Sequence, residues 1–141
     1  MPIRSLRSIV DGRTPITVAK TVTVVEAARA MKQQNVGALL VVDGGRLCGI
    51  FTERDALFRV LAEGRDPGAT TLAQVMTPQP QTIHPDKPFL HALRIMHVGR
   101  FRHLPVVEDG RPLGMVSSRD ALDEDLYELR TNLAQREDML E

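Results

Sequence analysis

A short motif with the composition of a ligand site occurs twice in the chain. It consists of a glycine, a hydroxyl residue and an aspartate spaced three positions apart: Gly49, Thr52 and Asp55, then Gly114, Ser117 and Asp120. A carboxylate can accept hydrogen bonds from both hydroxyls of a cis-diol. A hydroxyl residue at a helix start lies beside unpaired backbone N–H groups and the positive end of the helix dipole, which favour phosphate. The motif therefore suits a ligand that carries a diol and a phosphate.

The same spacing also has a purely structural explanation. Thr52 with Asp55, and Ser117 with Asp120, match the capping box, in which a hydroxyl and a carboxylate three residues later bond each other's backbone N–H groups. Such a cap stabilises a helix by about 1 kcal/mol without any ligand. The two roles are compatible, because the hydroxyl can cap while the carboxylate faces a cleft. Both interpretations therefore remain open at this point.

The two motifs belong to a longer internal duplication. Residues 36–57 and 101–122 align without gaps at an offset of 65 positions. Ten residues of the first segment recur in the second: Leu39, Val41, Val42, Gly45, Arg46, Gly49, Arg54, Asp55, Ala56 and Leu57. Repeats of this kind are supersecondary units that bury their apolar faces against each other. The chain is therefore expected to contain two similar units packed face to face.

Each unit has the pattern of a β-α-β-β-α element. In the first, the extended stretch 16–18 follows a proline, and a capping box at Thr23 starts a helix that runs to about Gln34. The sequence 43–45, Asp-Gly-Gly, then predicts a tight hairpin turn, because glycine readily adopts positive φ.

The second unit repeats this order with an extended stretch at 81–83 and a helix from near Pro88 to Gly99. We predict an α/β fold of two pseudo-twofold related β-α-β-β-α units, each with a small mixed sheet. The predicted domains are residues 5–64 and 70–122, separated by the Gly- and Pro-containing linker 64–68.

Residues 123–141 are predicted to continue the last helix of the second unit. Apolar side chains with alternating gaps of four and three form a heptad-like seam, interrupted by Arg136: Leu122, Leu126, Leu129, Leu133 and Leu140. Such a helix can lie on its own domain or pack on a partner chain, and the sequence leaves both possibilities open.

The composition excludes several classes of protein. The 141 residues include eighteen basic and eighteen acidic side chains, so no nucleic-acid footprint is expected. No apolar run is long enough for a membrane span, and the N-terminal segment lacks a signal-peptide core. The single cysteine, Cys48, is expected to be a buried inert thiol in a reducing, cytoplasmic environment.

Neither an enzyme nor a metal site is expected. The chain has no nucleophile elbow, P-loop or dinucleotide glycine motif. The four histidines, His84, His91, His97 and His103, all lie in the second unit. His91 and His97 are six positions apart, which does not place them on one helix face as a metal-binding pair requires.

With the duplicated motif in place, the chain resembles a tandem pair of CBS (cystathionine-β-synthase type) domains, the unit called a Bateman module. The resemblance extends from about residue 5 to 122 and includes the stretches 75–78, Val-Met-Thr-Pro, and 104–107, Leu-Pro-Val-Val. It implies two clefts that bind AMP, ADP, ATP or S-adenosylmethionine as a regulatory ligand, with no obligatory cofactor. It also implies a stand-alone regulatory module that acts by conformational change or partner binding. A ligand-free dimerisation module is the alternative, and the sequence names no regulated protein.

The candidate ligand-binding residues follow from the duplicated motif and the resemblance together. They are Thr52, Asp55, Arg102, His103, Ser117, Asp120, Val18, Ile83, Arg54, Arg119 and Pro105. The extended stretches that contain Val18 and Ile83 are expected to line an adenine pocket.

The resemblance further implies that each cleft is completed across the pseudo-twofold axis. Thr52 and Asp55 are then expected to share a cleft with Arg102 and His103, which grip the phosphate of a charged nucleotide. The cleft of Ser117 and Asp120 would take a less charged adenosine ligand or stay empty. In the alternative interpretation, Arg102 is a solvated surface residue and His103 a half-buried strand residue. The small sheets and the family's tendency to pair modules also predict a homodimer.

Overall fold

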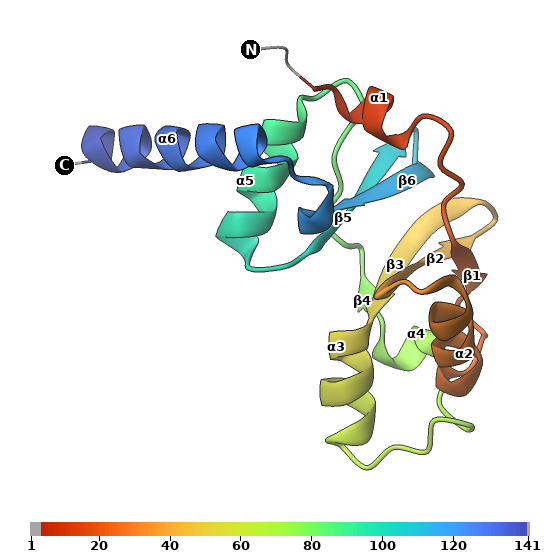
Figure 1. The fold of residues 1–141 in the computed structure, drawn as a ribbon. Helices are drawn as coiled ribbons and strands as arrows, with labels where there is room; N and C mark the ends of the chain where they lie inside the picture. Colours follow the sequence, from red (N-terminus) through yellow and green to blue (C-terminus); the bar gives the residue numbers. More distant parts are fainter. Residues whose placement is uncertain (1–3, 141) are drawn as a thin grey trace.

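The computed structural model describes residues 4–140, and all side chains in that range except those of 123, 124 and 136–140. Two α/β units lie side by side, and a long C-terminal helix extends from the second (Figure 1). The predicted α/β fold with two β-α-β-β-α units is confirmed.

The first unit follows the predicted order. Its elements are β1 (Thr17–Ala19), α2 (Val24–Gln34), β2 (Ala38–Asp43), β3 (Arg46–Thr52), α3 (Glu53–Asp55) and the π-helix η1 (Ala56–Leu61). Thr23 closes the expected capping box with Glu26 at the start of α2. Gly44 and Gly45 form the β2–β3 turn with φ of 60° and 79°, the left-handed region that glycine adopts without strain. The local sequence signals therefore define this unit well.

The second unit has the same order, but the strand that corresponds to β1 is reduced. Its elements are α5 (Phe89–Gly99), β5 (His103–Glu108), β6 (Arg111–Ser117), the 3-10 turn η2 (Ser118–Asp120) and α6 (Asp123–Leu140). The strand that corresponds to β1 is reduced to one parallel bridge between Ile83 and Val106. Pro105 explains this loss, since it has no N–H, whereas its counterpart Leu40 donates to the Ile16 carbonyl at 3.1 Å.

The short helices that precede the two units are exchanged between them. The helix α1 (Leu6–Val10) places Leu6 and Val10 in the core of the second unit, beside Phe89. The helix α4 (Leu72–Val75) packs in the core of the first unit, and the following strand β4 (Thr77–Pro78) pairs with β3. The first sheet therefore has the order β1-β2-β3-β4, while β5 and β6 form a two-stranded sheet.

A third apolar cluster joins the two units. Ala38, Leu40 and Ile50 of the first unit are buried there, and Met115 of the second packs against them. Ile50 and Met115 occupy equivalent positions of the duplication, so this cluster lies about the pseudo-twofold axis. The predicted face-to-face packing is thus observed.

The C-terminal helix is present, but it does not continue the helix at the end of the motif. Ala121 is extended, with φ of −72° and ψ of 132°, and breaks the chain between η2 and α6. The Asp125 carboxylate accepts a hydrogen bond from the Leu122 N–H at 2.8 Å and so starts a new helix. Leu129 is buried and Leu133 partly buried in the core of the second unit, so α6 packs on its own domain at these positions. The side chains of Arg136 and Leu140 lie outside the described residues, as does residue 141.

Among the described residues, none of the helices is both long and apolar enough to span a membrane. Cys48 is a free thiol, half-buried against the first core.

Candidate functional site

A cleft of about 640 Å³ is lined by residues of both units. The first unit contributes Ala28, Met31, Lys32, Asn35, Val36, Gly37, Glu53 and Ala56, and the second contributes Arg102, His103, Met115, Ser117, Ser118, Arg119 and Asp120. Arg13, from the segment after α1, completes the lining. The cleft thus gathers most of the second copy of the motif.

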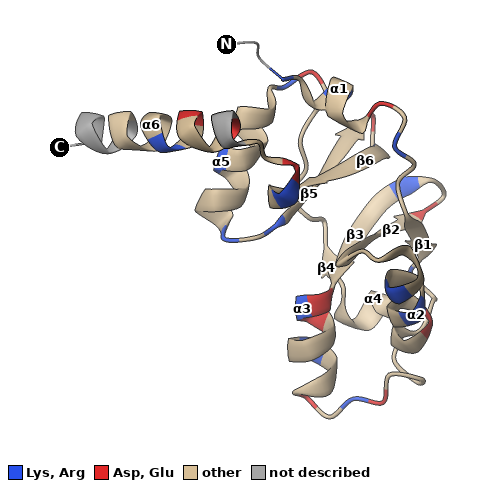
Figure 2. Ribbon diagram, in the orientation of Figure 1, with Lys and Arg blue, Asp and Glu red and all other residues tan. Residues whose placement is uncertain are grey.

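The β5–β6 hairpin explains why these side chains meet. His103, the first residue of β5, is the register partner of Ser117, the last residue of β6. The Ser118 N–H donates to the Arg102 carbonyl at 3.3 Å, which ties the turn η2 to the start of β5. An antiparallel hairpin brings its two open ends together, so the sequence stretches around 102 and 117 share one end of the unit. Figure 2 shows acidic and basic residues adjoining at η2.

Both carboxylate oxygens of Asp120 accept hydrogen bonds within the cleft. One carboxylate oxygen, Oδ2, accepts from the Ser117 N–H at 2.8 Å, and Oδ1 accepts from Nη2 of Arg13 at 2.7 Å. Burial by itself would raise the pKa of Asp120. The hydrogen bonds from Arg13 and Ser117 outweigh it, aided by the charges of Arg13 and Arg4, and hold this pKa below its usual value. Asp120 is therefore a carboxylate at neutral pH.

His103 faces the first unit across the cleft. Partial burial lowers its pKa; the positive charges of Arg119 and Arg102 add to this effect, and Glu53 opposes it. Gly37 lies beside this pair: a Cβ there would be 3.2 Å from Oε1 of Glu53 and 3.5 Å from Nε2 of His103. The glycine therefore leaves room for the two side chains.

The charges of the cleft favour an anion. Among the described residues that line it, Arg13, Lys32, Arg102 and Arg119 are basic, while Glu53 and Asp120 are acidic. One of the two acids, Asp120, is already paired with Arg13 at 2.7 Å. Guanidinium groups match the paired oxygens of a phosphate, so the remaining bases can hold a phosphorylated ligand.

The first copy of the motif is used differently. Oδ2 of Asp55 accepts from the N–H and the hydroxyl of Thr52 at 3.0 and 3.1 Å, which completes a capping box. Oδ1 of Asp55 lies 3.5 Å from Nε of Arg59, whose Nη1 donates to the carbonyls of Val75 and Met76. Thr52 and Asp55 do not line the cleft. Here the helix-cap interpretation describes the observed geometry.

Five of the predicted site residues line the cleft together: Arg102, His103, Ser117, Arg119 and Asp120. The others lie elsewhere. Ile83 is buried and Val18 partly buried in the two cores, Pro105 is fully buried, and Arg54 stacks over the ring of Phe58 at 5.2 Å.

The expected pairing of Thr52 and Asp55 with Arg102 and His103 is not observed. Because the hairpin joins His103 to Ser117, the phosphate-binding candidates lie with the aspartate of their own copy. From the helix start of the first copy, Glu53, next to Thr52, lines the cleft.

Sequence reasoning missed Arg13, Lys32 and Glu53. Glu53 had a signal, since it directly follows Thr52 of the motif. Arg13 had none, because its position depends on the exchange of α1 onto the second unit. Lys32, in the last turn of α2, likewise reaches the cleft only through the packing of one unit on the other.

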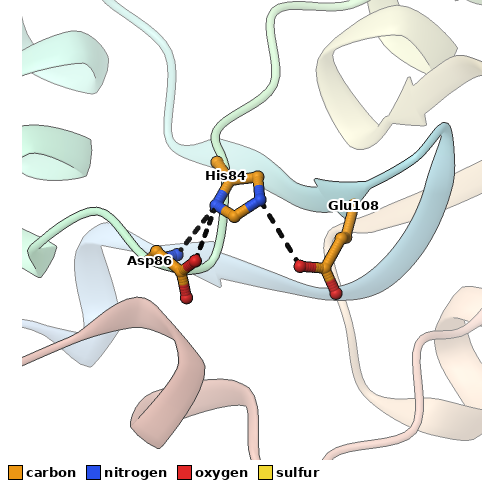
Figure 3. Close-up of side chains that lie close together, drawn as sticks. All are labelled: His84, Asp86 and Glu108. Atoms are coloured by element: carbon orange, nitrogen blue, oxygen red, sulfur yellow. Dashed lines mark hydrogen bonds and ion pairs between the residues drawn. The ribbon is translucent and has the colours of Figure 1, made fainter.

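A separate group of potential metal ligands comprises His84, Asp86 and Glu108, whose ligand atoms lie within 4.8 Å of one another (Figure 3). Nδ1 of His84 accepts from the Asp86 N–H at 3.1 Å, and Nε2 lies 3.4 Å from Glu108. Arg7 bonds to both carboxylates, at 2.9 and 3.0 Å. This guanidinium already supplies the positive charge, so the group serves to anchor α1. Glu108 comes from a distant strand, which is why the sequence did not suggest the cluster.

Comparison with known proteins identifies the family. The family model for the CBS domain matches twice, at residues 7–62 and 72–127. The chain belongs to the CBS-domain family. The resemblance inferred from the duplicated motif is thereby confirmed.

Several relatives and solved structures share this architecture. The chain is 39% identical over 116 residues to the mitochondrial CBS domain-containing protein CBSX3 of Arabidopsis thaliana, covering 79% of this chain and 56% of that protein. It is 38% identical over 104 residues to the CBS domain-containing protein YhcV of Bacillus subtilis, covering 74% of each. The first of these relatives is therefore substantially longer than the matched region, and for a Schizosaccharomyces pombe relative the chain spans only 16% of the length.

Two of the similar solved structures contain adenosine compounds. A CBS domain protein from Pyrobaculum aerophilum, complexed with AMP, has a TM-score of 0.79 and 26% identity, with 92% of this chain and 99% of that chain covered. The CBS domain pair of protein MJ0100, in complex with 5′-methylthioadenosine and S-adenosyl-L-methionine, has a TM-score of 0.74 and 31% identity, with 93% and 98% covered.

Proposed function

We propose that the cleft around Asp120 binds an adenosine nucleotide, and that the protein is a regulatory module that answers to this ligand by changing conformation or partner affinity. The proposal rests on one observation: an ionised aspartate, a histidine and several basic side chains line one cleft between the two units. The adenosine compounds bound by two similar CBS proteins support it.

Each part of such a ligand has a complement in this cleft. The Asp120 carboxylate can accept the two ribose hydroxyls, and the guanidinium groups of Arg102 and Arg119 can bind phosphate oxygens. The apolar side chains of Met31, Val36 and Met115 offer a surface for the base. This arrangement favours AMP, ADP or ATP over S-adenosylmethionine, because the sulfonium of the latter is positively charged and would face the same bases.

Isothermal titration calorimetry with AMP, ATP and S-adenosylmethionine tests the proposal. Asp120→Ala should weaken nucleotide binding by at least about thirtyfold, since it removes a charged hydrogen-bond acceptor. Asp55→Ala is the matched control from the other copy. It should leave the affinity of the folded protein within about threefold, because among the described residues the partners of Asp55 are Thr52 and Arg59 of the first unit.

The alternative, a ligand-free dimerisation module, predicts that the wild-type protein binds no nucleotide. In that case millimolar nucleotide would not raise the melting temperature of the wild-type protein, although a ligand that binds only the folded state must do so. Loss of binding in Asp55→Ala with retention in Asp120→Ala would instead assign the ligand to the first copy.

We also infer that the protein forms a homodimer. Leu57, Phe58 and Leu61 of η1 are at least half exposed, and so are the corresponding Leu122 and the neighbouring Tyr127 of the second unit. Exposed apolar side chains gathered on one helix, as on η1, mark association surfaces. Light scattering should give twice the monomer mass, and the double variant Leu57→Ser/Leu61→Ser should give the monomer mass. A wild-type monomer at micromolar concentration would contradict the dimer.

A further inference from the structure

Three arginines tie residues 4–13, here called the N-terminal strap, to the second unit. Arg4 forms an ion pair with Asp125 and donates to the Asp120 carbonyl at 3.2 Å. Arg7 bonds Asp86 and Glu108 outside the cleft. Arg13 bonds the Asp120 carboxylate inside the cleft. The strap therefore ends on the one carboxylate that the proposed function assigns to the ribose.

Of these three arginines, Arg13 is the one that lines the cleft. Among the described residues, its one hydrogen bond besides that to Asp120 goes to the Met115 carbonyl, at 3.4 Å, and its side chain is 43% exposed. Asp120 is in contrast only 17% exposed, and its other oxygen holds the Ser117 N–H. The carboxylate oxygen that faces Arg13 is thus the one that a diol would have to take over.

We propose that Arg13 changes its partner when the nucleotide binds. Without ligand, Arg13 pairs with Asp120. When the ribose hydroxyls bind Asp120 in its place, Arg13 moves to the phosphate. This inference rests on the proposed function. The guanidinium then keeps an anionic partner in both states, so the exchange carries little electrostatic cost for a phosphorylated ligand. For a nucleoside without phosphate, displacing Arg13 leaves its charge without a partner.

The exchange is specific to the second copy. The position equivalent to Arg13 in the duplication is Pro78, which has no charge. Asp55 pairs instead with Arg59 on its own helical segment, 3.5 Å away. Occupancy of the cleft would therefore act on the N-terminal strap and on no corresponding segment of the first unit. Arg13 thereby makes binding at this cleft selective for ligands that carry a phosphate.

Calorimetry with two probes, adenosine and AMP, tests the exchange on the full chain. In Arg13→Gln, adenosine should bind about two- to fivefold more tightly, since it no longer displaces a partly exposed ion pair. AMP should bind equally well or more weakly, because its phosphate loses the guanidinium of Arg13 as a partner. The ratio of the adenosine Kd to the AMP Kd should therefore fall. Lys20→Gln, which removes an exposed ion pair with Asp43 away from the cleft, should leave this ratio unchanged.

The outcomes separate the exchange from the proposed function. An unchanged adenosine Kd, or equal weakening of both probes, overturns the exchange while leaving nucleotide binding intact. Failure of both probes to bind the wild-type protein overturns the proposed function and the exchange with it. Arg13→Ala repeats the comparison without an amide that can itself bond Asp120, and circular dichroism confirms that each variant is folded.

Discussion

The two copies of one motif illustrate how similar residues acquire different uses. The side chains of Asp55 and Asp120 are 11% and 17% exposed, and each caps the N–H of its own hydroxyl residue. Asp55 pairs with Arg59 inside the first unit, whereas Asp120 lines the cleft and pairs with Arg13 of the N-terminal strap. The partner arginine, more than the burial of the carboxylate, distinguishes the two sites.

The residues after the motif explain the choice of partner. In the first unit the chain continues helically into η1, and Arg59 reaches both Asp55 and the end of α4. In the second unit the equivalent position is Glu124, and the chain is extended at Ala121. Asp120 therefore cannot be neutralised from its own helix, which leaves it for the strap and for a ligand.

The largest expected contrast is in stability. Asp55→Ala should lower the free energy of unfolding by about 2–3 kcal/mol, because it removes the acceptor of two hydrogen bonds from Thr52 at a buried helix start. Asp120→Ala should cost only about 1 kcal/mol, since it removes one hydrogen bond from Ser117 and an ion pair whose arginine is 43% exposed. Urea denaturation of both variants measures the difference. Equal costs would mean that the two aspartates are structurally equivalent after all.

A smaller contrast is expected at the two motif glycines. A Cβ at Gly114 would lie 3.0 Å from Cβ of Val10, while a Cβ at Gly49 would overlap the side chain of Met76. Val10 is β-branched and can yield only if α1 moves, whereas a methionine can change rotamer. Gly114→Ala should therefore cost about 2 kcal/mol and Gly49→Ala about 1 kcal/mol in urea denaturation. A larger cost for Gly49→Ala would show that α4 is the more rigidly packed of the exchanged helices.

The smallest expected effect concerns pH and His103, whose counterpart in the first copy is Ala38. Burial lowers the pKa of His103, so the ligand-free cleft holds a neutral imidazole at neutral pH. A bound phosphate favours the protonated form and raises this pKa, so binding takes up a proton and strengthens as pH falls. Between about pH 7.5 and about pH 6, wild-type protein should gain about threefold in AMP affinity relative to His103→Gln.

Calorimetry at both pH values, with the two proteins compared directly, cancels the titration of the AMP phosphate itself. Parallel pH profiles of wild type and His103→Gln would place His103 away from the phosphate. The stability of the ligand-free protein depends on pH in the opposite direction. Because the pKa of His103 is lower in the folded state, the unfolded chain takes up the proton first as pH falls through about 6.5. The free energy of unfolding therefore decreases as pH falls.

Much of the architecture could be predicted from local sequence. The offset of 65 residues revealed the two units, and short-range rules located the capping box at Thr23 and the glycine turn of the first hairpin. These features depend on backbone conformations and hydrogen bonds within a few residues, so the sequence contains all that they require. Sequence reasoning also named five of the residues that line the cleft, but it grouped Arg102 and His103 with Thr52 and Asp55 and not with Ser117 and Asp120.

Only the tertiary structure decided which copy faces the cleft and what completes it. The pairing of Arg13 with Asp120 joins residues far apart in the chain, and it exists because α1 packs in the core of the second unit. Such contacts are selected by the burial of apolar surface between distant segments, which no local pattern of residues records.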